Sequence, residues 1–254
     1  MHVTESGSGT PLVLLHAFPF DARMWDRVVI GLSSEARVIT PDLRGFGRTP
    51  LAGAPDLEVL ARDVVAMLDE LGLDRVVLGG CSMGGYVAMG VLRAAPARVG
   101  GLVLIDTRSA ADTLPAKENR FAMADRVERE GVAWLPDELA AALLGATTVA
   151  RRADVLATVR RLMGAAPAAS VAWAQRAMAG RPDSGATLRA RDIPALIVHG
   201  AEDTLIPPDS AHALSELLPR AEVVIFPDAG HLPPLEVPAD VTAAIANWLE
   251  RNGF

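Results

Sequence analysis

The sequence predicts an α/β protein: a mainly parallel β-sheet flanked by helices, with an inserted helical cap. Two observations carry this fold class. Short runs of apolar, β-branched residues alternate with helical patterns along most of the chain. The alternation breaks once, over roughly residues 107–193, where helical patterns follow one another without a convincing strand. With 254 residues, 50% of them apolar, the chain can also bury a large core.

Six short apolar runs are predicted to be strands buried on both faces, because they lack the polar alternation of a half-exposed strand. The predicted strands are Leu12–Leu15, Arg37–Thr40, Arg75–Leu78, Leu102–Ile105, Ala195–Val198 and Glu222–Phe226. Helical patterns separate most of them, and a strand–helix–strand connection places its two strands parallel in one sheet. The sheet is therefore expected to be mainly parallel.

Apolar residues recur at helical spacing in three segments that would flank this sheet. The stripes run over Trp25–Leu32, Leu57–Leu71 and Val241–Leu249. Asp56 stands directly before the second stripe, and aspartate is a residue type that caps a helix N-terminus by accepting a backbone N–H. Each stripe predicts a helix with one face on the sheet.

The stretch without strands is too long for a single crossover connection. It holds helical stripes at Leu135–Leu143 and Val155–Met163, with prolines and glycines between them. We therefore predict that residues 108–189 form a helical cap over the carboxyl edge of the sheet. The core would then consist of residues 1–107 and 190–254. The alternative is two ordinary crossover helices with loops.

Composition excludes several classes of protein. A net charge of −7 offers no basic face to a nucleic acid or an anionic membrane. Cys81 is the only cysteine, which excludes an intrachain disulfide and a cysteine-rich metal site; we expect no metal and no cofactor. No signal-peptide pattern and no bilayer-length apolar run is present, so we expect a cytoplasmic protein. The sequence is compatible with a homo-oligomer.

The sharpest motif is Gly-Cys-Ser-Met-Gly at residues 80–84, between a predicted strand and a helical pattern. Gly-x-Ser-x-Gly in this context is a nucleophile elbow, and it makes Ser82 the predicted nucleophile. The turn is so tight that side chains two positions from the serine would collide, which explains both glycines. A phosphate-binding loop is the alternative, but neither a Gly-Lys-Ser/Thr nor a Gly-x-Gly-x-x-Gly pattern is present. Cys81 should point away and not be catalytic.

A serine hydroxyl needs a base that takes its proton, and the base needs a carboxylate that orients it. His231 is the predicted base, because it stands in a loop just after the last predicted strand. Asp203, which follows the strand Ala195–Val198, is the predicted acid, because an elbow serine is expected to precede first its acid and then its histidine. Asp106 ends another strand at the same edge and is the competing candidate.

Acyl transfer also needs N–H groups aimed at the developing oxyanion. We expect one from the backbone of Met83, directly after the nucleophile, and a second from Phe18 in the loop after the first long strand. His16 in the same loop should hold that loop in place by hydrogen bonds. Pro19 has no N–H to donate.

Taken together and in this order, the motifs resemble the α/β-hydrolase superfamily over essentially the whole chain. The resemblance is carried by His16–Phe20, Met24–Asp26, Pro41–Thr49, the elbow, His199–Asp203 and Gly230–His231. Within the superfamily the chain is similar to small cofactor-free esterases, 3-oxoadipate enol-lactonases and non-haem haloperoxidases (perhydrolases). The resemblance implies a mainly parallel, eight-stranded sheet and a helical lid. The short N-terminus indicates that the first antiparallel hairpin is clipped.

The predicted function is hydrolysis of a carboxylic ester or lactone through an acyl-enzyme. The substrate is expected to be a small to medium, largely apolar molecule, and no macromolecular partner is expected. Perhydrolysis on the same triad is an alternative, because peroxide can trap the same acyl-enzyme. A non-catalytic, ligand-binding member of the fold is a second alternative.

The pocket should lie between the sheet edge and the cap, lined by apolar side chains. The candidates are Phe18, Phe20, Met83, Phe121, Met123, Trp134, Leu135, Leu139, Leu143, Trp173 and Leu232. Each candidate in the cap could equally well be buried in the core of the cap instead of lining the pocket. The cap arginines 151, 152, 160 and 161 could attract an acidic substrate, although a solvated helix face explains them equally simply.

Overall fold

The computed structural model describes all residues 1–254. One seven-stranded sheet has the order β1-β3-β2-β4-β5-β6-β7, and only the edge pair β1 and β3 is antiparallel. The strands are β1 (Val3–Ser6), β2 (Pro11–Leu15), β3 (Arg37–Pro41), β4 (Val76–Cys81), β5 (Val99–Ile105), β6 (Ala195–Gly200) and β7 (Ala221–Phe226). The predicted α/β class with a mainly parallel sheet is confirmed.

The number of strands corrects the expectation drawn from the resemblance, because the sheet has seven strands and not eight. The apolar runs also do not reveal β1, the one antiparallel strand. Its residues are only half-buried or exposed. An edge strand next to solvent stabilises itself through backbone hydrogen bonds to β3, so its side chains carry no apolar signal.

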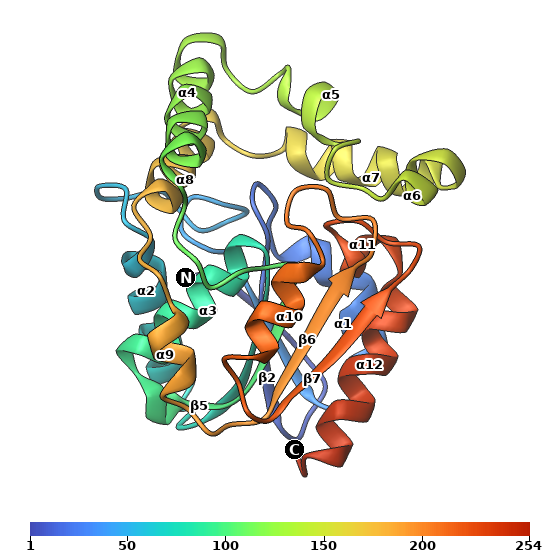
Figure 1. The fold of residues 1–254 in the computed structure, drawn as a ribbon. Coiled ribbons are helices and arrows are strands. Elements are labelled where there is room, and N and C mark those ends of the chain that lie inside the picture. Colours follow the sequence, from blue (N-terminus) through green and yellow to red (C-terminus); the bar gives the residue numbers. More distant parts are fainter.

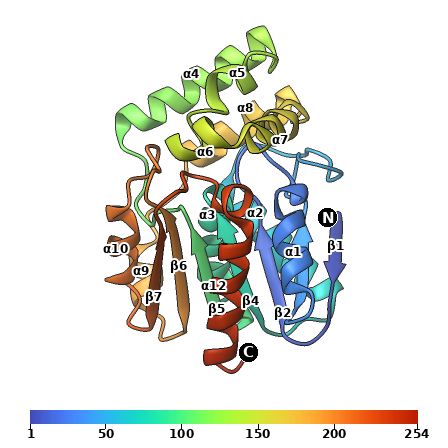
Figure 2. The ribbon, with the colours of Figure 1, turned by 90° about the vertical axis from the view of Figure 1, so that its right-hand side faces the viewer.

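Helices cover both faces of the sheet, as Figures 1 and 2 show. On one face lie α1 (Asp26–Leu32) and α12 (Pro238–Arg251); on the other lie α2 (Leu57–Glu70) and α3 (Met83–Ala94). Asp56 caps α2 by accepting the Glu58 N–H at 3.0 Å, as predicted. The remaining helices are short: η1 (Ala22–Trp25), η2 (Pro96–Arg98), α9 (Gly185–Arg189), α10 (Asp209–Ser215) and α11 (Pro233–Glu236).

The central strands are buried along their whole length, because helices lie on both faces of the sheet. Every residue of β4, β5 and β6 is buried, while β7 at the edge is half-buried throughout. Continuous Val, Leu and Ile runs are the composition that a doubly covered parallel strand requires. The rigid sheet positions the loops at its carboxyl edge, where the candidate site lies.

A helical insert lies across this carboxyl edge, above the strand ends in Figure 1. It contains α4 (Leu114–Glu130), α5 (Leu135–Leu139), α6 (Ala146–Arg151), α7 (Ala153–Gly164) and α8 (Ala168–Ala179), with α4 packed on α8 and α5 on α7. The predicted helix over Leu135–Leu143 stops at Leu139. We retain residues 108–189 as the proposed extent of the cap. None of the helices is both long and apolar enough to span a bilayer.

Candidate active site

Ser82 occupies a sharp turn between β4 and α3. Its backbone has φ 52° and ψ −112°, a left-handed conformation that residues other than glycine rarely adopt. A Cβ built on Gly80 would lie 2.2 Å from the Gly84 carbonyl carbon, and one built on Gly84 would lie 2.2 Å from the Leu15 oxygen. The chain therefore leaves no room for other residues beside this serine, which stands at the N-terminus of α3.

His231, in the loop before α11, pairs with Asp203 from the loop after β6. Nδ1 of His231 lies 2.7 Å from Oδ2 of Asp203, and both side chains are buried. Oδ1 of Asp203 accepts the N–H groups of Leu205 and Ile206 at 2.8 and 3.0 Å. Burial alone would raise the pKa of Asp203, but the hydrogen bond and charge of His231 and these N–H groups lower it. An ionised carboxylate here keeps the histidine proton on Nδ1.

The competing acid, Asp106, does not touch His231. Its Oδ1 accepts the Gly200 N–H at 3.0 Å, and its Oδ2 is buried without a partner. Burial, reinforced by the nearby charge of Asp203, raises the pKa of Asp106 well above its usual value. Burial therefore opposes a negative charge on Asp106, whereas Asp203 is the carboxylate whose charge is stabilised beside the histidine.

Asp106, His199 and Asp203 bring ligand-type atoms within 4.8 Å of one another, a spacing that could hold a metal ion. Two of these groups already have other partners. Asp203 accepts three hydrogen bonds, and Nε2 of His199 lies 2.8 Å from the Ile206 oxygen. Metal ligands must also be deprotonated, and burial raises the pKa of Asp106, which opposes its ionisation. The cluster is therefore a poor donor set for a cation.

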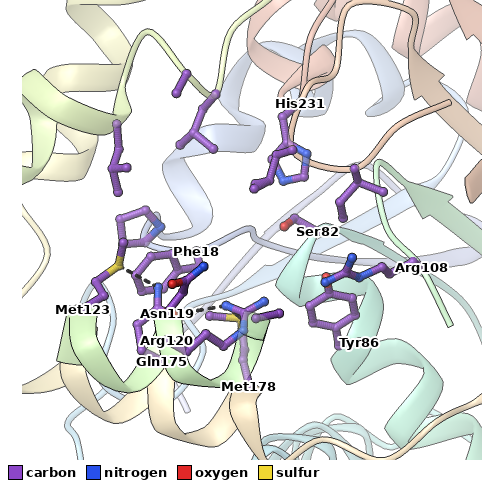
Figure 3. A pocket seen from close by; sticks show the side chains of 17 residues that line it. Phe18, Ser82, Tyr86, Arg108, Asn119, Arg120, Met123, Gln175, Met178 and His231 are labelled. Carbon is purple, nitrogen blue, oxygen red and sulfur yellow. Dashed lines mark hydrogen bonds between the residues drawn. The ribbon is translucent and has the colours of Figure 1, made fainter. Parts of the chain in front are cut away.

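Ser82 and His231 face one cavity of about 370 Å³ between the sheet edge and the insert (Figure 3). Nε2 of His231, the nitrogen not bonded to Asp203, is buried without a hydrogen-bond partner. No hydrogen bond joins it to Ser82 in this structure. Catalytic hydrogen bonds are often long in unliganded enzymes and shorten when the substrate binds.

The backbone N–H groups predicted to bind the oxyanion are free. Met83 is the first residue of α3, where a helix offers its N–H no internal partner. Phe18 lines the cavity, and its N–H donates to no group of the chain. His16 holds the Phe18 loop: its Nδ1 lies 3.0 Å from the Ala17 oxygen and its Nε2 accepts the Leu43 N–H at 2.9 Å. Burial lowers the pKa of His16, so its ring is neutral.

Cys81 is the neighbour of Ser82 but does not line the cavity. The thiol is fully buried, with Sγ 3.8 Å from the carbonyl oxygen of His231. Burial, with the charges of Asp106 and Asp203, raises the pKa of this thiol well above its usual value. The thiolate is the nucleophilic form, so a buried, protonated thiol is inert.

Glu236 fixes the loop that carries His231. Its side chain is buried; Oε1 accepts the N–H groups of Gly230 and Leu232 at 2.9 and 3.0 Å. Oε2 accepts the N–H of Gly145, which belongs to the insert, at 2.8 Å. One carboxylate therefore ties the histidine loop to the helical insert.

Part of the predicted pocket lining is placed elsewhere by the structure. Phe18, Met123, Leu139 and Leu143 line the cavity. The side chains of Phe20, Met83, Leu135 and Leu232 are instead buried in the hydrophobic core. The structure thus places these four residues outside the cavity lining. Helical or loop spacing marks a residue as buried but does not say which neighbour buries it.

The aromatic residues of the insert also lie outside the cavity. Trp173 donates its indole N–H to the Gly53 oxygen at 2.9 Å, and the Arg126 guanidinium lies 3.7 Å above the Trp134 ring. Phe121 is 46% exposed. All three are predicted to bind substrate, and none of them is among the residues that line this cavity.

The cavity has a polar side that the sequence reasoning missed. Arg108 follows β5, Asn119 and Arg120 come from α4, and Gln175 comes from α8. A signal existed for Arg108, since residues just beyond the carboxyl ends of parallel strands face this edge. Nothing in the sequence distinguishes Arg120 from the other arginines. The predicted alternative, the arginines at 151, 152, 160 and 161, contributes no residue to the cavity.

The chain matches the profile of the alpha/beta hydrolase fold family over residues 10–238. Among solved structures, a thermophilic esterase from Thermogutta terrifontis, with malate bound, is 41% identical. It superposes with a TM-score of 0.95, covering 98% of this chain and 93% of its own.

Curated relatives that match nearly the whole chain include two that are more than 30% identical to it. A pimeloyl-[acyl-carrier protein] methyl ester esterase from Aromatoleum aromaticum is 33% identical, over 92% of this chain and 96% of its own length. The dihydrolipoyllysine-residue acetyltransferase component of an acetoin cleaving system from Pseudomonas putida is 31% identical over 96% of this chain. The chain spans only 64% of that protein's length.

Proposed function

This chain belongs to the alpha/beta hydrolase fold family, and we propose that it is a serine hydrolase that cleaves a carboxylic ester or lactone through an acyl-enzyme. The observation that carries the proposal is the arrangement of His231. Its Nδ1 contacts an ionised Asp203 at 2.7 Å, while its Nε2 is unpartnered and faces the cavity that it shares with Ser82. An imidazole held in this way can accept the proton of a serine hydroxyl.

In the proposed first step, Ser82 Oγ attacks the carbonyl carbon of the ester and His231 Nε2 takes the hydroxyl proton. The carbonyl oxygen becomes an oxyanion and is bound by the N–H groups of Phe18 and Met83. When the tetrahedral intermediate collapses, His231 gives its proton to the leaving alcohol. Water then attacks the acyl-enzyme with His231 again as base, which releases the acid and restores Ser82.

The ester class is supported by the lining of the cavity and by the relatives. The apolar side chains Phe18, Leu139 and Leu143 offer a surface for the hydrocarbon part of a small to medium substrate. The thermophilic esterase and the methyl ester esterase support an ester over other acyl derivatives. A lactone is an internal ester and requires the same steps.

Ser82→Ala tests the proposal with p-nitrophenyl butyrate as substrate. The variant should lose at least about a thousandfold in kcat, because no other group at the site can form the acyl-enzyme. Cys81→Ala is the matched control, one residue away in the same turn, and should keep most of the activity. Undiminished hydrolysis by Ser82→Ala, or an equal loss in Cys81→Ala, would contradict the assignment.

A fluorophosphonate probe separates the hydrolase from a ligand-binding member of the fold. We expect a covalent adduct on Ser82 that is absent from Ser82→Ala. Absence of any adduct on the folded wild-type protein would favour a binding role. The perhydrolase alternative is tested by adding peroxide and acetate and measuring peracetic acid, since peroxide would then compete with water for the acyl-enzyme.

A further inference from the structure

The cavity beside Ser82 is positively charged, although the chain as a whole carries −7. Arg108 and Arg120 are its charged lining residues besides the titratable His231, and no aspartate or glutamate lines it. Figure 3 draws both arginines on the same side of the cavity, below Ser82 and His231 in that view. A purely apolar ester would offer these two guanidinium groups no negative charge.

Behind the lining, three arginines surround one carboxylate. Asp112 is fully buried at its side chain; its oxygens lie 2.7 Å from Arg108 Nη2, 2.5 Å from Arg120 Nε and 2.7 Å from Arg181 Nη1. Burial alone would raise the pKa of Asp112, but the hydrogen bonds and charges of Arg181 and Arg120 lower it. The cluster therefore holds three positive charges against one negative charge.

Among the three arginines, Arg181 does not line the cavity and has a structural role. Its side chain is buried (3% exposed), lies 4.1 Å above the Tyr86 ring and donates to the Ala110 oxygen at 2.6 Å. It thereby joins the segment after α8 to the segment after β5, where the insert leaves and re-enters the core. If the charge of Asp112 is counted against that of Arg181, the positive charges of Arg108 and Arg120 have no negative charge to balance them.

Arg108 and Arg120 also retain donors that have no partner. Arg108 makes a single hydrogen bond, through Nη2, and its buried Nε has no acceptor. Arg120 uses Nε and Nη1 on Asp112, Gln175 and Met178, which leaves Nη2. Arg108 Nη1 and Arg120 Nη2 make no hydrogen bond within the protein, so a ligand oxygen could accept from them.

We propose that Arg108 and Arg120 form a carboxylate-binding subsite, and that the ester or lactone cleaved at Ser82 carries a free carboxylate. The inference rests on the proposed function, because it assigns a substrate class to the same site. A planar guanidinium matches a carboxylate with two parallel N–H···O bonds. The apolar side chains of Met123 and Met178, which line the same cavity, suit the methylene groups between that carboxylate and the scissile carbonyl.

The carboxylate can belong to the acid or to the alcohol part of the ester, and two substrate pairs separate these cases. For the acid part, methyl hydrogen glutarate is compared with methyl pentanoate, which has the same chain length without the charge. For the alcohol part, the acetate ester of γ-hydroxybutanoate is compared with butyl acetate. Proton release at constant pH measures kcat/KM for each ester.

We expect the wild-type protein to prefer the charged member of one pair by roughly tenfold or more, as a charge-assisted hydrogen bond provides. Arg108→Gln should lower this preference roughly tenfold to a hundredfold. Asp112 keeps Arg120 and Arg181 in that variant, so the protein should fold. Arg120→Gln provides a second, independent variant.

Arg160→Gln is the matched control, because it removes the same charge from the insert at a surface site outside the cavity. It should leave the preference unchanged. An equal loss of preference in Arg160→Gln would mean that overall charge, and not this subsite, steers the substrate. No preference in the wild-type protein, or a preference that survives in both cavity variants, also contradicts the subsite.

Calorimetric titration of glutarate into folded Ser82→Ala protein tests the subsite without turnover. Binding that weakens at least about tenfold when Arg108→Gln is added supports the subsite even if no ester is hydrolysed. Hydrolysis of the neutral esters without glutarate binding would leave the proposed function standing and reject the subsite. The two proposals therefore fail in distinguishable ways.

Discussion

The insert meets the core at two junctions that carry opposite charges. At the arginine junction, Arg108, Arg120 and Arg181 surround the single carboxylate of Asp112. At the glutamate junction, Glu236 and Glu202 accept hydrogen bonds from the insert and from the histidine loop. Glu236 takes the N–H groups of Gly145, Gly230 and Leu232, and Glu202 takes the N–H and hydroxyl of Thr147.

The two junctions differ in whether their charged groups keep hydrogen-bonding atoms without a partner. Both carboxylate oxygens of Glu236 accept backbone N–H groups of the protein, so they are not available to a ligand. At the arginine junction, guanidinium groups outnumber the carboxylate, and some donors stay free beside the cavity. The glutamate junction holds the His231 loop in place, and the arginine junction is the one that keeps donors for the proposed ligand.

Glu236→Ala gives the largest expected effect and tests the structural role of the glutamate junction. Removal of this acceptor leaves three buried N–H groups without partners, so the free energy of unfolding should fall by about 3 kcal/mol or more. Urea unfolding measures the loss, and hydrolysis should fall with it because the His231 loop is released. Glu216→Ala, at an exposed glutamate, is the control; a loss of the same size there would refute the explanation.

Arg181→Met tests whether the arginine junction also has a structural part. Asp112 keeps two guanidinium partners in this variant, so we expect a loss of about 2 kcal/mol, below that of a fully broken buried pair. Thermal and urea unfolding measure it. The surface variant Arg176→Met should lose no more than about 0.5 kcal/mol, because exposed ion pairs contribute little. Equal stability of Arg181→Met and wild type would contradict a structural role for this arginine.

Asp112→Asn sharpens the comparison through its pH dependence. Because the pKa of Asp112 is lowered in the folded protein, its charge stabilises the fold above the unfolded pKa of about 3.9, and this contribution is lost as pH falls through the folded pKa. The variant should be less stable than wild type by about 1 kcal/mol at neutral pH, and the gap should close in acid.

Urea unfolding of both proteins between neutral pH and about pH 3 follows that gap. Asp137→Asn, at an exposed carboxylate, serves as the control and should track wild type throughout. A gap that stays constant with pH would show that Asp112 acts by shape and not by charge. Glutarate should bind Asp112→Asn at least as tightly as wild type, since the cluster then has no internal anion.

Glu202→Gln gives the smallest expected effect and marks the weak end of the glutamate junction. Hydrogen bonds from the Thr147 hydroxyl and N–H lower the pKa of Glu202, but this residue is only half-buried, whereas Glu236 is fully buried. The amide can keep one of the two hydrogen bonds, so the free energy of unfolding should change by less than about 0.5 kcal/mol. A loss as large as that of Glu236→Ala would mean that both glutamates hold the insert equally.

Much of the core and of the predicted site can be inferred from the sequence, because these features are local in the chain. Doubly buried strands need continuous apolar runs, and the tight turn at Ser82 excludes any residue but glycine at positions 80 and 84. The order of Ser82, Asp203 and His231 follows the order of the strands that carry them. The polar edge strand β1 is the exception, since it pairs with β3 through its backbone and offers no continuous apolar run.

Only the tertiary structure decided which of these residues touch. Asp106 and Asp203 follow neighbouring strands, but Asp106 accepts the Gly200 N–H while Asp203 is bonded to His231. In the insert, helical spacing marks a buried face without naming its neighbour, so Trp173 packs on the Gly53 loop while Arg120 reaches the cavity. Spacing along a chain fixes which side of an element is buried. Contacts between distant segments depend on how whole elements pack, and no local pattern encodes that.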